Sequence, residues 1–294
     1  MVAQRSIRRR IAAFFPFMRR ALARIEDLES KNREMESLIA IHSQEKIALM
    51  ESIYATQADH VLNNSKENLP LPPAHLRFGV VGTTDASHFT KMGHLMVSIT
   101  TEVLRSEGIL IGDMSRILDF GCGVGKILRY LPQLDSLKLY GTDNDSQAIA
   151  WCKANLPFVR FNQNELSPPL PYPSEFFDMT LAFSVFTHLP EFLQNLWLKE
   201  LHRILKPTGH LILTLNSEAF LEFQLQHISP LELNSFRNGQ LIVKNSLRVG
   251  QMPCMAFHPA DYVMKWMSPY FEMIHVIPCL DEDCKQSYYL FRKR

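Results

Sequence analysis

Cysteine pairs, long apolar runs and an excess of charge of one sign are all missing from this sequence of 294 residues. Its 5 cysteines include no C-x-x-C pair, so we expect free thiols in a reducing compartment and no metal site. No apolar run reaches the roughly 18 residues that a membrane-spanning helix requires. Lys and Arg total 31 against 30 Asp and Glu, which argues against a nucleic-acid partner. With 46% apolar residues, the chain is predicted to be globular with a full core.

Although the net charge of the whole sequence is close to zero, its first residues are strongly basic. Residues 1–24 hold seven Arg and no acidic residue, interleaved with Ile and Phe. This basic amphipathic segment is predicted to lie on an anionic membrane surface, with a basic tail and a transit peptide as open alternatives. No small-residue cleavage site follows its apolar run, so we expect a cytoplasmic protein, held peripherally at the inner membrane face if the segment binds lipid.

A long helix is predicted over residues 18–60, because no Gly or Pro occurs between Phe17 and Asn68. A heptad register that starts at Ile25 places Asn32 at an a position, which is typical of two-stranded coiled coils. We therefore predict a homodimer through residues 18–53. His42 and Lys46 interrupt the apolar stripe of this register, and a surface helix packed on its own domain is the alternative.

An α/β domain is predicted over residues 77–294, after a polar and then Pro-rich linker at 61–76. Apolar runs alternate there with helical patterns, as in βα units around a parallel sheet. Residues 217–255 show no regular pattern. Strands are predicted at 116–120, 137–142, 158–161, 176–183, 210–216, 271–277 and 287–292, and helices at 87–107, from the glycines to 131, 146–155, 190–205 and 259–267.

The most informative segment is a glycine loop between a predicted strand and a predicted helix, Arg116-Ile-Leu-Asp-Phe-Gly-Cys-Gly-Val-Gly-Lys126. It fails the phosphate-loop pattern, because Phe120 and Ile127 stand where that pattern requires Gly and a hydroxyl. It also fails the dinucleotide fingerprint, because Lys126 replaces the third Gly. Asp119 would repel a pyrophosphate and suits a cationic ligand such as the ammonium group of an amino acid.

This loop resembles the first motif of class I S-adenosylmethionine-dependent methyltransferases, and the likeness extends over about residues 115–216. The resemblance implies a Rossmann-like seven-stranded sheet with helices on both faces and one antiparallel strand near an edge. It implies S-adenosylmethionine as methyl donor and no metal. As a whole, the sequence is similar to bacterial methyltransferases of surface-glycan and small-molecule pathways.

The same resemblance assigns cofactor-binding residues. Asp143, at the end of the second strand, is expected to accept both ribose hydroxyls, with Asn144 beside it. Asp145 is the alternative, although an acid at this position also serves as a helix N-cap. The loop residues expected around the methionine part of the cofactor are Asp119, Phe120, Gly121, Cys122, Gly123 and Gly125.

The adenine site departs from the family pattern, in which an Asp commonly follows the third strand. Asn164 is expected to accept the adenine amino group there, with Glu165 beside it, because an amide oxygen accepts the same hydrogen bond without charge. Asn162 occupies the same region and is the alternative. Phe183 is the last residue of the predicted fourth strand and is expected to face the cofactor.

His188, in the loop after the fourth strand, is the predicted general base, with His227 and His258 as alternatives. The predicted reaction is methyl transfer to a hydroxyl or another nucleophile of a small-molecule, glycan or lipid-linked acceptor. A non-catalytic coiled-coil assembly factor that binds the cofactor is the alternative function. A nicotinamide-dependent oxidoreductase is disfavoured by Asp119 and by the missing third Gly.

Overall fold

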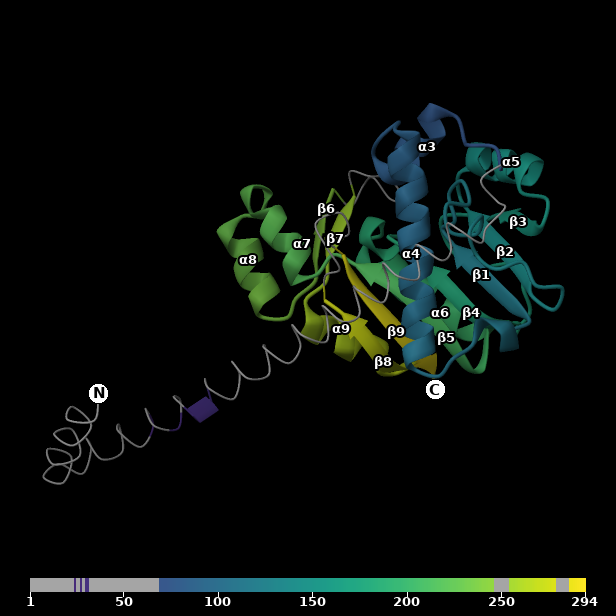
Figure 1. Ribbon diagram of the computed structural model, residues 1–294. Coiled ribbons are helices and arrows are strands. Elements are labelled where there is room, and N and C mark those ends of the chain that lie inside the picture. The colour runs from purple at the N-terminus through teal and green to yellow at the C-terminus, as the bar shows by residue number, and fades with distance from the viewer. Residues whose placement is uncertain (1–23, 25–26, 28–29, 32–68, 246–253, 279–285) are drawn as a thin grey trace, which may run out of the picture. The chain divides into compact units, whose positions relative to one another are not determined.

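The computed structural model describes most of the chain from residue 69 onward (Figure 1). The predicted basic segment and heptad stripe fall almost entirely outside the described residues, as does the first half of the predicted linker, residues 61–68. Among the few described residues of the N-terminal region, Asp27 pairs with Arg24 at 3.2 Å and with Lys31 at 3.1 Å. The described residues are Arg24, Asp27, Ser30, Lys31 and the ranges 69–245, 254–278 and 286–294.

A seven-stranded sheet in the order β3-β2-β1-β4-β5-β9-β8 forms the centre of the domain. β9 runs antiparallel to its neighbours β5 and β8, and the other pairs are parallel. The predicted α/β fold class is therefore confirmed, including the single antiparallel strand near the edge. The strands are β1 (Arg116–Phe120), β2 (Lys138–Asp143), β3 (Val159–Gln163), β4 (Phe177–Ala182), β5 (Leu205–Leu215), β8 (Phe271–Ile277) and β9 (Ser287–Lys293).

Helices cover both faces of this sheet, as consecutive residues of β9 show. The Tyr288 hydroxyl donates to Thr100 Oγ1 of α4 (Ala86–Ser106) at 2.9 Å. Tyr289 belongs instead to the core cluster that contains α6 (Glu191–Ile204) and α9 (Ala260–Met267). Because successive side chains of a strand point to opposite faces, α4 lies on one face and α6 and α9 on the other (Figure 1).

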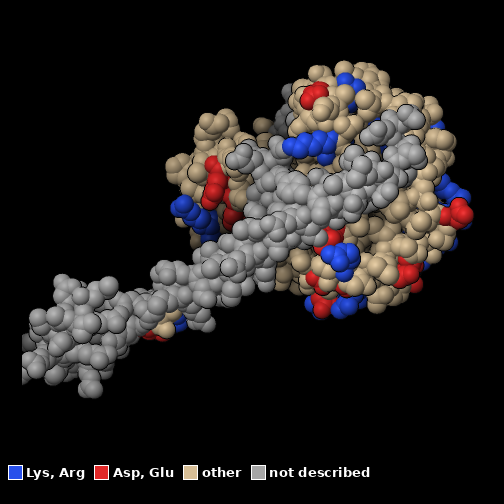
Figure 2. Space-filling model, viewed as in Figure 1, with Lys and Arg blue, Asp and Glu red and all other residues tan. Residues whose placement is uncertain are grey.

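Burial on both faces explains why the central strands are almost continuously apolar. Ile117 and Leu118 of β1 are both fully buried although they point in opposite directions. Where the described surface is visible in Figure 2, Lys and Arg are interspersed with Asp and Glu. Among the described helices, none combines the length and apolar character needed to cross a membrane.

The predicted helix after the glycine loop is wrong. Turns occupy this stretch, in which the Arg129 N–H reaches the Gly125 carbonyl and the Tyr130 N–H reaches the Ile127 carbonyl. The mixed four-residue and three-residue spacings do not form a regular helical ladder. Side chains at helical spacing are nonetheless buried there, which is the pattern that predicted the helix: Val124, Ile127, Leu128 and Leu131.

The prediction of irregular structure over 217–255 is also wrong for its described part. That part contains α7 (Glu218–Phe223), a 3₁₀ turn (Leu225–His227), α8 (Pro230–Arg237), β6 (Ile242–Lys244) and the first residue of β7 (Met255–Phe257), which pairs with β6. We call these five elements the cap lobe. Its strands have 3 residues each and its helices 6 and 8, too short for periodicity to reveal.

The remaining helices frame the site described next. α3 (Ala74–Val81) begins within the range predicted as linker, and α5 (Ser146–Asn155) matches its prediction. β5 begins at Leu205, earlier than predicted, because the chain passes from the end of α6 directly into extended backbone.

Candidate functional site

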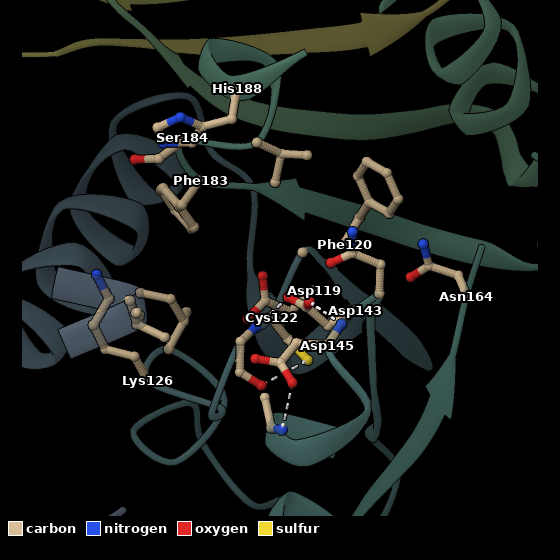
Figure 3. Close-up of a pocket in the computed structure, with 18 of the residues that line it drawn as sticks. Asp119, Phe120, Cys122, Lys126, Asp143, Asp145, Asn164, Phe183, Ser184 and His188 are labelled. Atoms are coloured by element: carbon tan, nitrogen blue, oxygen red, sulfur yellow. Dashed lines mark hydrogen bonds between the residues drawn. The ribbon is translucent and has the colours of Figure 1, made fainter. Parts of the chain in front are cut away.

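A cavity of about 270 Å³ opens where the carboxyl ends of β1, β2 and β4 meet. Parallel strands bring these ends to one edge of the sheet, so loops from distant parts of the sequence line the same space. In Figure 3 the acidic side chains and Cys122 lie near the centre, with Lys126 and Asn164 on opposite sides and His188 above. The predicted cofactor residues that line the cavity are Asp119, Phe120, Gly121, Cys122, Gly123, Asp143, Asn144, Asn164, Glu165 and Phe183.

The glycine loop forms a tight turn after β1. Gly121 and Gly123 have φ values of 73° and 51°, the left-handed region that favours glycine. A Cβ on Gly121 would lie 2.3 Å from Val185 Cγ2, and one on Gly123 would lie 2.7 Å from Val80 Cγ2. These glycines therefore let the turn after β4 and helix α3 approach the loop. Gly125 does not line the cavity, because it packs beneath the loop against Leu156.

Asp119 places an unsatisfied carboxyl group in this cavity. Its side chain is only 2% exposed, and Oδ2 has no hydrogen-bond partner in the described part of the chain. Burial raises the pKa of Asp119 to about 8, against the lowering effect of Lys126 and with a smaller raising effect of Asp143. Buried polar atoms are nearly always paired in proteins, so this oxygen marks a place for a hydrogen-bond donor, preferably a cation.

Asp143 closes the loop from the neighbouring strand. Its Oδ2 accepts the Gly123 N–H at 2.7 Å, and its Oδ1 accepts the Asp145 N–H at 2.9 Å. Burial raises the pKa of Asp143 above its usual range, although the backbone hydrogen bonds act in the opposite direction. Each carboxylate oxygen has a further lone pair, so the group is able to accept two more donors from the cavity.

The two alternatives to the predicted nucleoside contacts have structural partners. Asp145 caps α5, since its Oδ1 accepts the N–H groups of Gln147 and Ala148 at 2.8 and 3.1 Å, although it also borders the cavity. Asn162 does not line the cavity and donates to the Tyr172 hydroxyl at 3.0 Å.

Asn164 lines the cavity at the end of β3. Its Oδ1 accepts from the Thr142 hydroxyl at 2.7 Å, and its Nδ2 donates to the Glu165 carbonyl at 2.7 Å. These two contacts fix the orientation of the amide, so Oδ1 retains one lone pair for a further donor.

His188 lies at the end of a 3₁₀ turn, Phe186–His188, that follows β4, and it lines the cavity. Its Nδ1 is 2.8 Å from the carbonyl oxygen of Cys254. A carbonyl only accepts, so Nδ1 carries the hydrogen and Nε2 carries the lone pair. Burial lowers the pKa of His188, against the opposing effect of this hydrogen bond, and thus favours the neutral ring.

The other two predicted bases do not line the cavity. His227 is exposed on the cap lobe. His258 is fully buried, and burial lowers its pKa to about 3. Of the three histidines, only His188 therefore combines access to the cavity with a free ring nitrogen.

The structure adds lining residues that sequence reasoning missed. Helix α3 contributes several of them, and the Pro-rich composition before this helix kept it from being predicted. In the sequence, Lys126 stands out only because it replaces the third Gly of the dinucleotide fingerprint. Ser184 has a φ of 60°, a conformation that its sequence does not indicate. Across the described ranges, no group of three His, Cys, Asp or Glu is arranged to hold a metal ion. The added residues include His75, Leu76, Gly79, Val80, Lys126 and Ser184.

Comparison with known proteins shows what the region around the cavity is similar to. The family described as "Methyltransferase domain" matches residues 118–213, which run from β1 to β5. Among solved structures, a Methanosarcina mazei S-adenosylmethionine-dependent methyltransferase is 18% identical, with 65% of this chain and 96% of that one covered and a TM-score of 0.49. A Mesorhizobium loti S-adenosylmethionine-dependent methyltransferase is 14% identical, with 65% and 95% covered and a TM-score of 0.49.

Proposed function

We propose that this chain, whose residues 118–213 match the family described as "Methyltransferase domain", is a class I S-adenosylmethionine-dependent methyltransferase that methylates a hydroxyl group of a small-molecule, glycan or lipid-linked acceptor. The observation that carries the choice of a hydroxyl is His188. His188 lines the cavity, the Cys254 carbonyl holds its Nδ1, and its Nε2 has no hydrogen-bond partner in the described part of the chain. A hydroxyl is a poor nucleophile until it loses its proton, and a neutral imidazole is the usual acceptor near neutral pH.

The cavity residues fit the methyl donor. Asp119 offers an unpaired carboxyl oxygen that suits an ammonium group, and Asp143 has lone pairs for ribose hydroxyls. Asn164 keeps an acceptor position for an adenine amino group. When bound, S-adenosylmethionine supplies an electrophilic methyl group, and its sulfur keeps the electron pair of the broken bond.

The protein's own contribution is orientation and proton removal. The acceptor oxygen forms a bond to the methyl carbon, and its proton passes to Nε2 of His188. The neutral form of His188, which burial favours, is the form able to take this proton. General bases of this kind contribute about 10²- to 10⁴-fold to the rate.

Methyl transfer from tritiated S-adenosylmethionine to panels of hydroxylated small molecules, glycans and lipid-linked sugars tests this proposal. We expect an alkali-stable ether product, and His188→Gln should lower kcat by about 10²- to 10⁴-fold with little change in cofactor affinity. Alkali-labile label would show a carboxyl methyl ester and contradict the hydroxyl acceptor. Cofactor binding without transfer to any acceptor would favour the non-catalytic alternative. Full activity of His188→Gln would exclude His188 as the general base.

The N-terminal segments suggest two partners. Residues 18–53 support a homodimer through their heptad pattern, and residues 1–24 support attachment to anionic lipid through their seven Arg. Such attachment would hold a cytoplasmic enzyme at the inner membrane face, where lipid-linked acceptors lie. Both proposals concern residues that fall almost wholly outside the described part of the chain.

A further inference from the structure

The turn that carries His188 is held from inside the protein by one side chain. Gln194 is fully buried in the first turn of α6. Its Nε2 donates to the carbonyl of Phe186 at 3.0 Å and to that of Leu189 at 2.9 Å. Both carbonyls only accept, so they fix the orientation of the amide and direct Oε1 away from the turn.

His258 completes this arrangement on the other side of the amide. Its Nε2 is 3.0 Å from Gln194 Oε1, so this nitrogen must carry the hydrogen. The ring is fully buried, and its Nδ1 has no partner within the described ranges. His258 is attached in turn to the end of β5, where its N–H donates to the Asn216 carbonyl at 2.7 Å.

The short segment from Cys254 to His258 therefore contacts the His188 turn in two ways. Cys254 accepts directly from the imidazole ring, and His258 acts on the backbone of the turn through Gln194. Apolar packing alone would bury this turn without desolvating an amide and an imidazole. Burying these polar groups costs free energy of desolvation. In return, their directional hydrogen bonds fix the geometry of the turn more strictly than apolar packing does.

We propose that Gln194 and His258 are positioning residues, which fix the Phe186–Leu189 turn and thereby hold the His188 ring with Nδ1 on Cys254 and Nε2 toward the cavity. The use of that Nε2 as a base rests on the proposed function. The positioning itself does not, because every contact in it lies within the protein.

The tautomer of His188 measures this positioning directly. Nitrogen-15 NMR on the full-length protein at pH 8, without cofactor or acceptor, distinguishes a ring protonated at Nδ1 from one protonated at Nε2. The His188 signals are identified by their loss in His188→Gln. We expect the Nδ1–H tautomer in the wild type and its loss in Gln194→Leu, because the turn then loses both amide donors. Gln226→Leu, at an exposed position on the cap lobe, is the matched control and should leave the His188 signals unchanged.

A pair of substitutions at His258 keeps the test valid if Gln194→Leu does not fold. His258→Gln retains a donor for Gln194 Oε1 and should preserve the Nδ1–H tautomer, whereas His258→Leu should lose it. An unchanged tautomer in folded Gln194→Leu or His258→Leu would overturn the proposal, as would equal loss in both His258 variants. Methyl transfer that is independent of His188, in a protein with the expected tautomer, would count against the proposed function alone.

Discussion

The buried carboxyl group of Asp119 predicts that cofactor affinity depends on pH. Its pKa of about 8 means that the group is mostly protonated in the free protein at neutral pH. In the proposed function, the ammonium group of S-adenosylmethionine pairs with the ionised form of Asp119, so binding would release this proton. Raising the pH removes the proton beforehand, and the dissociation constant should therefore fall as pH rises toward 8.

The magnitude follows from the fraction of Asp119 that is ionised before binding. With a pKa of about 8, this fraction is roughly one in a hundred at pH 6 and about one in ten at pH 7. The dissociation constant should thus fall about tenfold between these pH values, or about 1.4 kcal/mol. The ammonium group of an amino acid stays largely protonated over this interval, since α-amino groups have a pKa near 8.

Calorimetry measures both consequences. Titrations with S-adenosylmethionine at pH 6 and pH 7 give the two dissociation constants, and titrations in buffers of different ionisation enthalpy count the released proton. Asp119→Asn should bind with little dependence on pH, and Asp135→Asn, an exposed site outside the cavity lining, should behave as wild type. Equal affinities at the two pH values, or binding without proton release, would refute the assignment of Asp119 to the ammonium group.

Four further predictions concern other parts of the chain. Asp143→Ala should weaken S-adenosylmethionine binding by about 10- to 150-fold in calorimetry, because roughly 1.5–3 kcal/mol of charge-assisted hydrogen bonding is lost. Gly123→Ala should lower the free energy of unfolding in urea by at least about 1 kcal/mol, because its φ is 51° and a Cβ would lie 2.7 Å from Val80. Gly112→Ala, with nothing within 4 Å of the added Cβ, is the matched control. Light scattering should show a dimer for the full chain and a monomer after removal of residues 1–60. Deletion of residues 1–24 should abolish co-sedimentation with anionic vesicles, which salt should weaken in the full chain.

Each of these predictions has a result that would contradict it. Undiminished cofactor affinity in Asp143→Ala would exclude the ribose contact, and equal stability of the two Gly variants would exclude a conformational role for Gly123. A monomeric full-length chain would remove the coiled-coil dimer. Equal binding to neutral and anionic vesicles would remove the electrostatic attachment.

The local sequence determined the strands and the glycine loop. A buried parallel strand needs only a short apolar run followed by residues that allow a turn, and β1 with Gly121 and Gly123 provides both within a few positions. The alternation of apolar runs with helical patterns was enough to predict the α/β class. The seven-stranded sheet with one antiparallel strand, and the role expected of Asp143 at the end of β2, followed from the resemblance to methyltransferases.

The short helices and strands could not be predicted from the sequence. The cap lobe consists of helices and strands of 3 to 8 residues, which carry too few side chains to show a period. The stretch after Gly125 buries its side chains at helical spacing without forming a regular helix. The spacing of apolar residues in a sequence indicates which side chains are buried. The packing around the segment then determines which hydrogen bonds its backbone forms.

Only the tertiary structure decided the state of the groups in the cavity. The sequence offered three histidines as candidate bases and favoured His188 over His227 and His258. The fold exposes His227, buries His258 and leaves His188 at the cavity with an Nε2 that has no partner among the described residues. It also raised the pKa of Asp119 by enclosing it. Protonation and tautomer depend on burial and on partners that lie tens of residues away in the chain. Such contacts exist only after folding, so local sequence determines which groups are present and the fold determines what each of them is able to do.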